Sequence, residues 1–186
     1  MMKDAYNTLN AMLTANHILS ATAEAIICYT LRFLQFESIC DTLLTDEAEY
    51  IRWLTLSRQM QQPAELARRM INELCDCQMD EHSYELIAEW LLAFYRKKDT
   101  RIRYPQKIRT DLLRQQHHRC AICGCAITEK AELDHVIPWK YVGDELKENL
   151  QLLCLECNRS KQASPLYQLR MLLRKGEHWQ QMAGSA

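Results

Sequence analysis

Glycine and proline are scarce in this chain of 186 residues, which contains four of each. Residues 1–95 have no glycine and a single proline, Pro63. Apolar residues in this region recur at the spacing of a helix, as at Ile27, Leu31 and Leu34, and do not alternate as in a strand. The region is therefore predicted to be all-helical, with helices near residues 4–17, 20–44, 46–61, 64–75 and 81–97.

The helix starts in this region are marked by residues that favour a first turn. Thr45 or Asp46, and also Asp80, are suited to accept hydrogen bonds from free backbone N–H groups. Pro63 interrupts the pattern and fits the first turn of the next helix. Because this part of the chain has no recognisable catalytic pattern, we expect its apolar stripes to fill the core of a helix bundle.

Long apolar runs are also missing. No stretch approaches the roughly 20 apolar residues that are needed to cross a bilayer. The first residues lack the basic and then apolar layout of a secretory signal. The sequence therefore predicts a cytoplasmic protein with no membrane partner.

Cysteine, by contrast, is abundant for such a compartment, with nine residues. Disulfides are rare in the cytosol, where paired Cys-x-x-Cys spacing indicates a metal site. The chain has two such pairs, Cys120/Cys123 and Cys154/Cys157, and Gly124 allows the tight turn that the first pair requires. Cys125 could compete with Cys123 as a ligand, although the matching spacing of the two pairs disfavours it. We predict one structural, tetrahedral Zn²⁺ bound by Cys120, Cys123, Cys154 and Cys157.

Charge is distributed unevenly along the chain. Residues 1–95 carry 6 Lys/Arg and 14 Asp/Glu, a net charge of −8, whereas residues 96–186 carry 17 and 10, a net charge of +7. A polyanion would be attracted to the second part. The basic stretch before Cys120 could be a solvated linker, but its position favours phosphate contacts from a helix that begins at Pro105 and displays Lys107, Arg109 and Arg114.

The segment between the cysteine pairs is predicted to form a strand, a loop, a second strand and a helix. The first strand ends near Asp134 and His135, and Gly143 lies in the loop. The letters NLQLLC read as the second strand, and the helix is expected to begin at Asn158.

LDHVIPW and ENLQLLCLECNRSK, within residues of about 105–165, resemble the HNH endonuclease family. The first motif histidine falls on His135, the middle asparagine on Asn149, and the third position on Asn158, which makes an H-N-N variant. The resemblance implies a zinc-stapled ββα-metal domain, placed over residues 99–186. Together with the helical spacing of the first part, this predicts an α+β, mostly helical chain in which an all-α domain over residues 1–98 comes first.

The resemblance also implies a reaction. Asp134 and Asn158 would offer oxygen ligands to one Mg²⁺ or Mn²⁺, which stabilises a leaving 3′ oxygen. His135 would act as the general base that takes a proton from water. Asn149 would fix the segment between the strands and hold the histidine in place.

The expected activity is cleavage of DNA, with Arg159 and Lys161 at a helix start meeting phosphate. The alternative is a non-catalytic, zinc-stabilised nucleic-acid-binding or scaffold protein. The acidic helical region is expected to bind a protein partner or a second copy of the chain, and the resemblance permits a role in phage defence or restriction.

Overall fold

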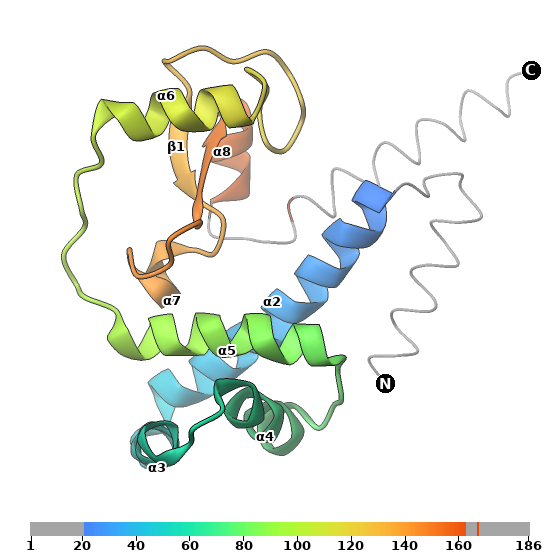
Figure 1. The fold of residues 1–186 in the computed structure, drawn as a ribbon, viewed down its shortest axis with the longest axis vertical. Coiled ribbons are helices and arrows are strands. Elements are labelled where there is room, and N and C mark those ends of the chain that lie inside the picture. The colour runs from blue at the N-terminus through green and yellow to red at the C-terminus, as the bar shows by residue number, and fades with distance from the viewer. Residues whose placement is uncertain (1–20, 163–166, 168–186) are drawn as a thin grey trace, which may run out of the picture.

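The computed structural model describes residues 21–162 and residue 167, so the helices expected near residues 4–17 and after Ser164 lie outside the described residues. The fold is mostly helical with a small two-stranded sheet, as predicted (Figure 1). In chain order the elements are α2 (Ala21–Thr45), α3 (Glu47–Gln59), α4 (Pro63–Cys75), α5 (Glu81–Arg96), α6 (Gln106–Gln115), β1 (Glu132–His135), α7 (Trp139–Val142), β2 (Leu150–Leu153) and α8 (Leu155–Lys161).

Two of the predicted capping residues begin helices as expected. The Asp46 carboxylate accepts hydrogen bonds from the backbone N–H groups of Ala48 and Glu49, at 3.0 and 3.1 Å. Asp80 accepts one from the N–H of Ser83 at 2.9 Å. These contacts replace hydrogen bonds that the first turn of a helix cannot make internally, so the sequence located the starts of α3 and α5 to within one residue.

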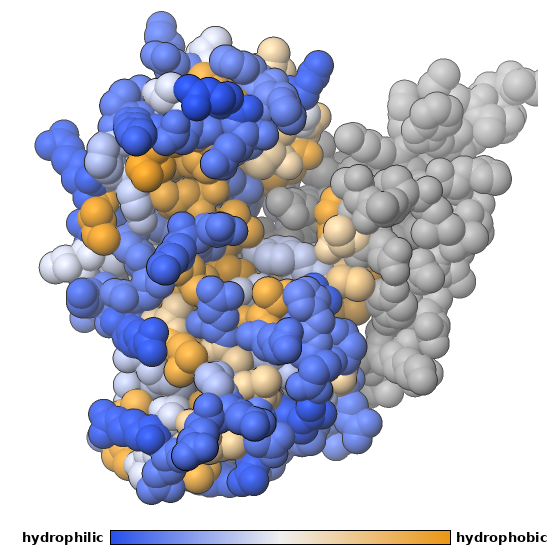
Figure 2. Space-filling view, viewed as in Figure 1, coloured by the Kyte–Doolittle hydropathy of each residue, from blue (hydrophilic) through white to orange (hydrophobic). Residues whose placement is uncertain are grey.

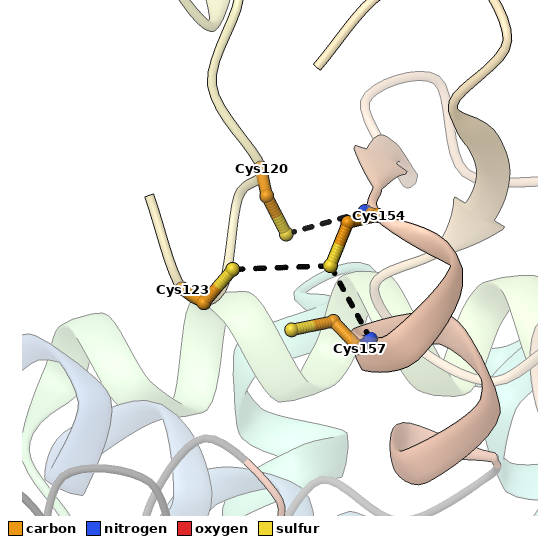
Figure 3. Close-up of side chains that lie close together, drawn as sticks. All are labelled: Cys120, Cys123, Cys154 and Cys157. Atoms are coloured by element: carbon orange, nitrogen blue, oxygen red, sulfur yellow. Dashed lines mark hydrogen bonds between the residues drawn. The ribbon is translucent and has the colours of Figure 1, made fainter. Parts of the chain in front are cut away.

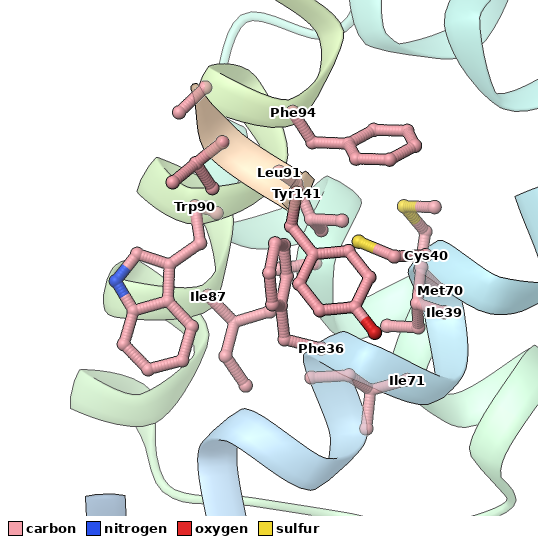
Figure 4. Packing of buried hydrophobic residues seen from close by; sticks show 14 of the residues in the cluster. Phe36, Ile39, Cys40, Met70, Ile71, Ile87, Trp90, Leu91, Phe94 and Tyr141 are labelled. Atoms are coloured by element: carbon pink, nitrogen blue, oxygen red, sulfur yellow. The ribbon is translucent and has the colours of Figure 1, made fainter. Parts of the chain in front are cut away.

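The main core lies where α2, α4 and α5 pack together (Figure 4). The aromatic rings of Phe36 and Trp90 meet edge to face, with centroids 5.6 Å apart. Phe36 also meets Tyr141, from the short helix α7, at 5.8 Å. The Tyr141 hydroxyl donates a hydrogen bond to the Glu37 carboxylate at 2.7 Å.

The same core takes in the loop that joins the two strands. Ile137, Tyr141 and Val142 are all buried and belong to the cluster that α2, α4 and α5 build. In Figure 2, hydrophobic side chains gather in the band between α6 and α5, where α7 lies, while hydrophilic ones cover the rims. Residues on both sides of the predicted boundary near residue 98 therefore share one core, and the division into two domains stays a prediction.

A second, smaller core supports the hairpin. β1 and β2 are antiparallel, with Asp134 opposite Gln151 and His135 opposite Leu150. Helix α6 contacts β2, and the Gln116 side chain just after α6 makes two hydrogen bonds with the backbone of Leu152, at 2.7 and 2.9 Å. The cluster comprises Leu113, Cys120, Ile127, Ala131, Leu152, Leu153 and Cys157.

Two predictions about the hairpin and its helix are corrected by the structure. The loop after β1 is not fully irregular, because α7 forms within it and buries its apolar face. Helix α8 begins at Leu155, so Asn158 is not its first residue. The cause is Cys154, whose sulfur accepts a hydrogen bond from the Cys157 N–H at 3.4 Å and thereby caps the helix.

Within residues 21–162, no helix is both long and apolar enough to cross a membrane.

Candidate active site

The side chains of the four predicted zinc ligands point toward one another and form a cluster (Figure 3). Their sulfur atoms all lie within 4.8 Å of one another, and those of Cys123 and Cys154 are 3.8 Å apart. A tetrahedron with Zn–S bonds of about 2.3 Å has sulfur atoms about 3.8 Å apart. The cluster therefore fits a zinc ion without rearrangement of the backbone.

The turn that carries the first cysteine pair explains how the chain can bring them together. Gly124 has φ +72° and its N–H donates a hydrogen bond to the Cys120 carbonyl at 3.0 Å. A side chain at Gly124 would be strained by this left-handed backbone. Cys125 is exposed and lies outside the four-sulfur group, in agreement with its weaker claim as a ligand.

The thiols of the cluster differ in how readily they ionise: burial and hydrogen bonds with Cys154 and Cys123 raise the pKa of Cys157, whereas the pKa of Cys123 is lowered. Burial alone would raise the pKa of the Cys123 thiol, but hydrogen bonds from Cys125 and from the thiols of Cys157 and Cys120 lower it to about 7. The thiolate is the form that binds metal.

His135 lies at the end of β1, and its imidazole contacts a carboxylate that sequence reasoning missed. The His135 Nε2 atom is 2.9 Å from Oδ1 of Asp144, whose side chain is only 5% exposed. Asp144 follows Gly143 in the loop, nine residues after the histidine, and no motif spacing singled it out.

Asp144 is held by four donors. Burial alone would raise the pKa of this carboxyl group, but hydrogen bonds from the Tyr104 hydroxyl, the Ile102 N–H, the Trp139 indole and His135 together hold the pKa well below its ordinary value. Asp144 is therefore a carboxylate acceptor throughout the physiological pH range.

Asp134 contacts a different set of residues. Its Oδ2 atom accepts hydrogen bonds from Gln151 Nε2 at 2.8 Å and from the Lys161 ammonium at 2.9 Å. Lys161 also donates to the backbone carbonyl of His135 at 2.9 Å. Consequently α8 is tied to the end of β1 by one buried cation.

These contacts correct the expected place of Lys161. It was predicted near a helix start, where free N–H groups favour phosphate, but it lies in the last turn of α8 and its side chain is 5% exposed. Arg159 is exposed in the same turn, so the helix start does not present either residue.

Asp134 and Asn158 supply suitable oxygen atoms for a hard cation. Asn158 is half-buried on α8, and α8 contacts β1. Among the described residues, its side-chain amide forms no hydrogen bond that would occupy its oxygen. A carboxylate with an amide oxygen is a donor set that Mg²⁺ accepts while keeping several waters. Their role as metal ligands stays a prediction.

Asn149 ties the loop to the hairpin from a buried position. Its side-chain oxygen accepts a hydrogen bond from the Ile137 N–H at 2.6 Å, and its amide nitrogen donates to the Ile137 carbonyl at 2.9 Å. Its own carbonyl accepts one from the Val136 N–H at 2.9 Å. Val136 and Ile137, the residues directly after His135, are therefore held by three hydrogen bonds to Asn149.

Replacing Asn149 with alanine should destabilise the protein by about 2–4 kcal/mol, because it leaves two buried backbone groups of Ile137 without partners. Urea denaturation measures the change. A substitution of exposed Gln115 with alanine, in α6, is the matched control and should change the unfolding free energy by less than about 0.5 kcal/mol. Equal stability of the Asn149 variant and wild type would contradict the role of this side chain.

The basic residues of the lead-in segment divide by exposure. Lys107 is exposed, and Arg114 is 77% exposed beside Asp111. Arg109 instead donates a hydrogen bond from its guanidinium to the Ala131 carbonyl, which joins α6 to the start of the hairpin. Contacts with nucleic acid stay a prediction for all of these residues.

Comparison with known protein families agrees with this geometry. The family model described as HNH endonuclease matches residues 120–164. The matched part contains both cysteine pairs together with His135, Asn149 and Asn158, and the resemblance drawn from the sequence is confirmed there. No curated protein and no solved structure matches the chain. The match indicates nuclease activity in general and a nucleic acid as substrate.

Proposed function

We propose that the protein is an HNH-type endonuclease that hydrolyses DNA phosphodiester bonds with one divalent cation. The observation that carries the proposal is the position of His135. Its imidazole lies at the end of β1, fixed by a buried carboxylate and next in sequence to Asp134. A pure zinc-stabilised fold does not require this arrangement.

In the proposed reaction His135 takes a proton from water, which attacks the phosphorus atom. The P–O3′ bond breaks and the leaving 3′ oxygen takes a proton from solvent water. The products therefore carry a 5′-phosphate and a 3′-hydroxyl group. Asp134 and Asn158 would hold Mg²⁺ or Mn²⁺, which supplies stabilisation of the negative charge on the leaving 3′ oxygen. Asn149 keeps the backbone after His135 in place while the proton moves.

The zinc ion has a separate, structural part in this proposal. Cys120, Cys123, Cys154 and Cys157 would hold it with four sulfur ligands, which would leave no coordination position for water or phosphate. The ion would join the turn after α6 to the first turn of α8, and Asn158 and Lys161 lie further along this helix.

DNA is expected to approach along the basic segment that leads into the hairpin. Lys107 and Arg114 are exposed on this segment and Arg159 is exposed on α8, and all three would neutralise phosphate charge with release of counterions. The acidic helical part, with its net charge of −8 over residues 1–95, is a poor surface for DNA and is proposed to bind a protein partner or a second copy of the chain. A role in phage defence or restriction and a cytoplasmic location stay predictions.

A nicking assay on supercoiled plasmid tests the proposal. In the presence of Mg²⁺ or Mn²⁺ the protein should convert the plasmid to nicked or linear forms, and the ends should be ligatable without added kinase because they carry 5′-phosphate. A non-catalytic binding or scaffold protein would retard the plasmid on a gel and leave it supercoiled, and that result would reject the enzyme.

A further inference from the structure

Asp144 lies outside the family motif, and both oxygen atoms of its buried carboxylate take part in hydrogen bonds. Oδ1 accepts hydrogen bonds from the Tyr104 hydroxyl at 2.6 Å and contacts His135 Nε2 at 2.9 Å. Oδ2 accepts hydrogen bonds from the Ile102 N–H and from the Trp139 indole, both at 3.0 Å.

The backbone around Asp144 is shaped to deliver this carboxylate. Gly143, the residue before it, has φ +58°, and a Cβ there would lie 3.0 Å from the side chain of Lys97. Lys97 and Arg101 both lie over the Trp139 ring, at 5.1 and 4.7 Å from its centroid. The loop and the segment after α5 are thus locked together around one acceptor.

The chemistry of a carboxylate decides the protonation pattern of the imidazole. A carboxylate only accepts hydrogen bonds, so the His135 Nε2 atom must carry a hydrogen to bind it. In the neutral ring the other nitrogen, Nδ1, then has a free lone pair. Among the described residues, Nδ1 has no hydrogen-bond partner, which leaves it for water.

We propose that Asp144 is a positioning residue that fixes the tautomer and the orientation of His135, so that Nδ1 is the atom that takes the proton from water. This inference rests on the proposed function of His135 as the general base. The same logic holds for a catalytic histidine whose partner carboxylate selects the tautomer in serine proteases.

The competing role for Asp144 is purely structural, as a clip between the loop and residues 102–104. Substitution with asparagine separates the two roles, because it keeps the shape of the side chain but turns one oxygen into an NH₂ donor. At the Oδ2 position this donor would face the Ile102 and Trp139 N–H groups, which cannot become acceptors.

The amide of the Asp144→Asn variant should therefore place its NH₂ at the Oδ1 position. There the Tyr104 hydroxyl can rotate to accept, and His135 Nε2 can accept if the ring proton moves to Nδ1. A protonated Nδ1 cannot take a proton from water. We expect kcat to fall on the order of 10³-fold with little change in KM, because the wrong tautomer removes the base and not the substrate contacts.

The matched control is Tyr104→Phe, which removes one hydrogen bond from the same carboxylate oxygen and leaves His135 bound. It should lower kcat by less than tenfold. If Asp144 were only a clip, both variants would weaken the same contacts, and their effects on kcat would be of similar size.

Nitrogen NMR of the His135 ring, on zinc-loaded full chain at about pH 8 without the catalytic cation, gives a readout that does not depend on activity. Wild type should show the Nε2–H tautomer and Asp144→Asn the Nδ1–H tautomer. An Nδ1–H ring in wild type, or equal kcat for wild type and a folded Asp144→Asn protein, would overturn the inference. Failure of wild type to cleave DNA while its ring shows Nε2–H would reject the proposed function and leave the assigned contact standing.

Discussion

Replacing His135 with alanine should lower the rate of DNA cleavage by about 10²- to 10⁴-fold, the range that general acid–base catalysis contributes. The imidazole lies at the end of β1, where it is proposed to take a proton from water, and it is hydrogen-bonded to Asp144. Removing it leaves the cysteine cluster and both cores untouched. Initial rates of plasmid nicking, with zinc content determined on the same protein, measure the effect.

A matched control for this variant is His82→Ala, which removes an imidazole that is 66% exposed on α5. That protein should cleave at the wild-type rate. His135→Ala should also melt within a few degrees of wild type, because one partly buried hydrogen bond is lost. Cleavage by His135→Ala at the wild-type rate would remove this residue from its role.

Replacing Cys154 with serine should release the zinc and unfold the hairpin with α8. Its sulfur is one of the four in the cluster and also caps α8 through the Cys157 N–H. Two strands of four residues each are marginal without further support. Structural zinc binds in small domains with about 10–16 kcal/mol, so its loss exceeds the stability such a hairpin can have alone.

Two measurements test the prediction for Cys154→Ser. Mass spectrometry gives the number of zinc ions per chain, and limited proteolysis reports unfolding. New cleavage sites should open at basic residues of the C-terminal part, such as Lys130 and Arg159, before the helical part is cut. Cys125→Ser changes an exposed cysteine outside the cluster and should keep the metal. Unchanged zinc content in Cys154→Ser would contradict the ligand set.

The helices and the zinc cluster could be predicted because local patterns determine them. Apolar residues at helical spacing and the caps Asp46 and Asp80 act within a few residues of chain. The two Cys-x-x-Cys pairs predict a common ion without knowledge of the path between them. The sequence also located β2, because the letters NLQLLC contain the strand Leu150–Leu153.

The contacts around His135 could not be predicted in the same way. Asp144 acts through donors 40 and 42 residues away in the chain, Tyr104 and Ile102, which only the folded loop brings together. Lys161 reads as a surface cation in the sequence, but its long side chain reaches from α8 to the end of β1. Both are tertiary contacts of charged residues, which leave no periodic signal.

The packing of α7 against the helices has the same origin. The letters WKYVGDELKE are compatible with a loop exposed to solvent. In the structure, however, Tyr141 and Val142 from this segment are buried in a core that residues 33–94 form. Tyr29 strengthens this link, since its hydroxyl donates to the Val136 carbonyl at 3.1 Å, one residue after His135. The acidic helical part thus supports the backbone of the candidate active site directly.

The most direct test of two ions with separate tasks is to measure metal content and nicking on one sample. Brief treatment with EDTA, followed by its removal, should leave one zinc per chain and no nicking, and added Mg²⁺ or Mn²⁺ should restore cleavage fully. Nicking by the EDTA-treated protein with zinc alone, or no recovery after Mg²⁺ and Mn²⁺ while zinc is retained, would contradict a loosely held catalytic cation beside His135.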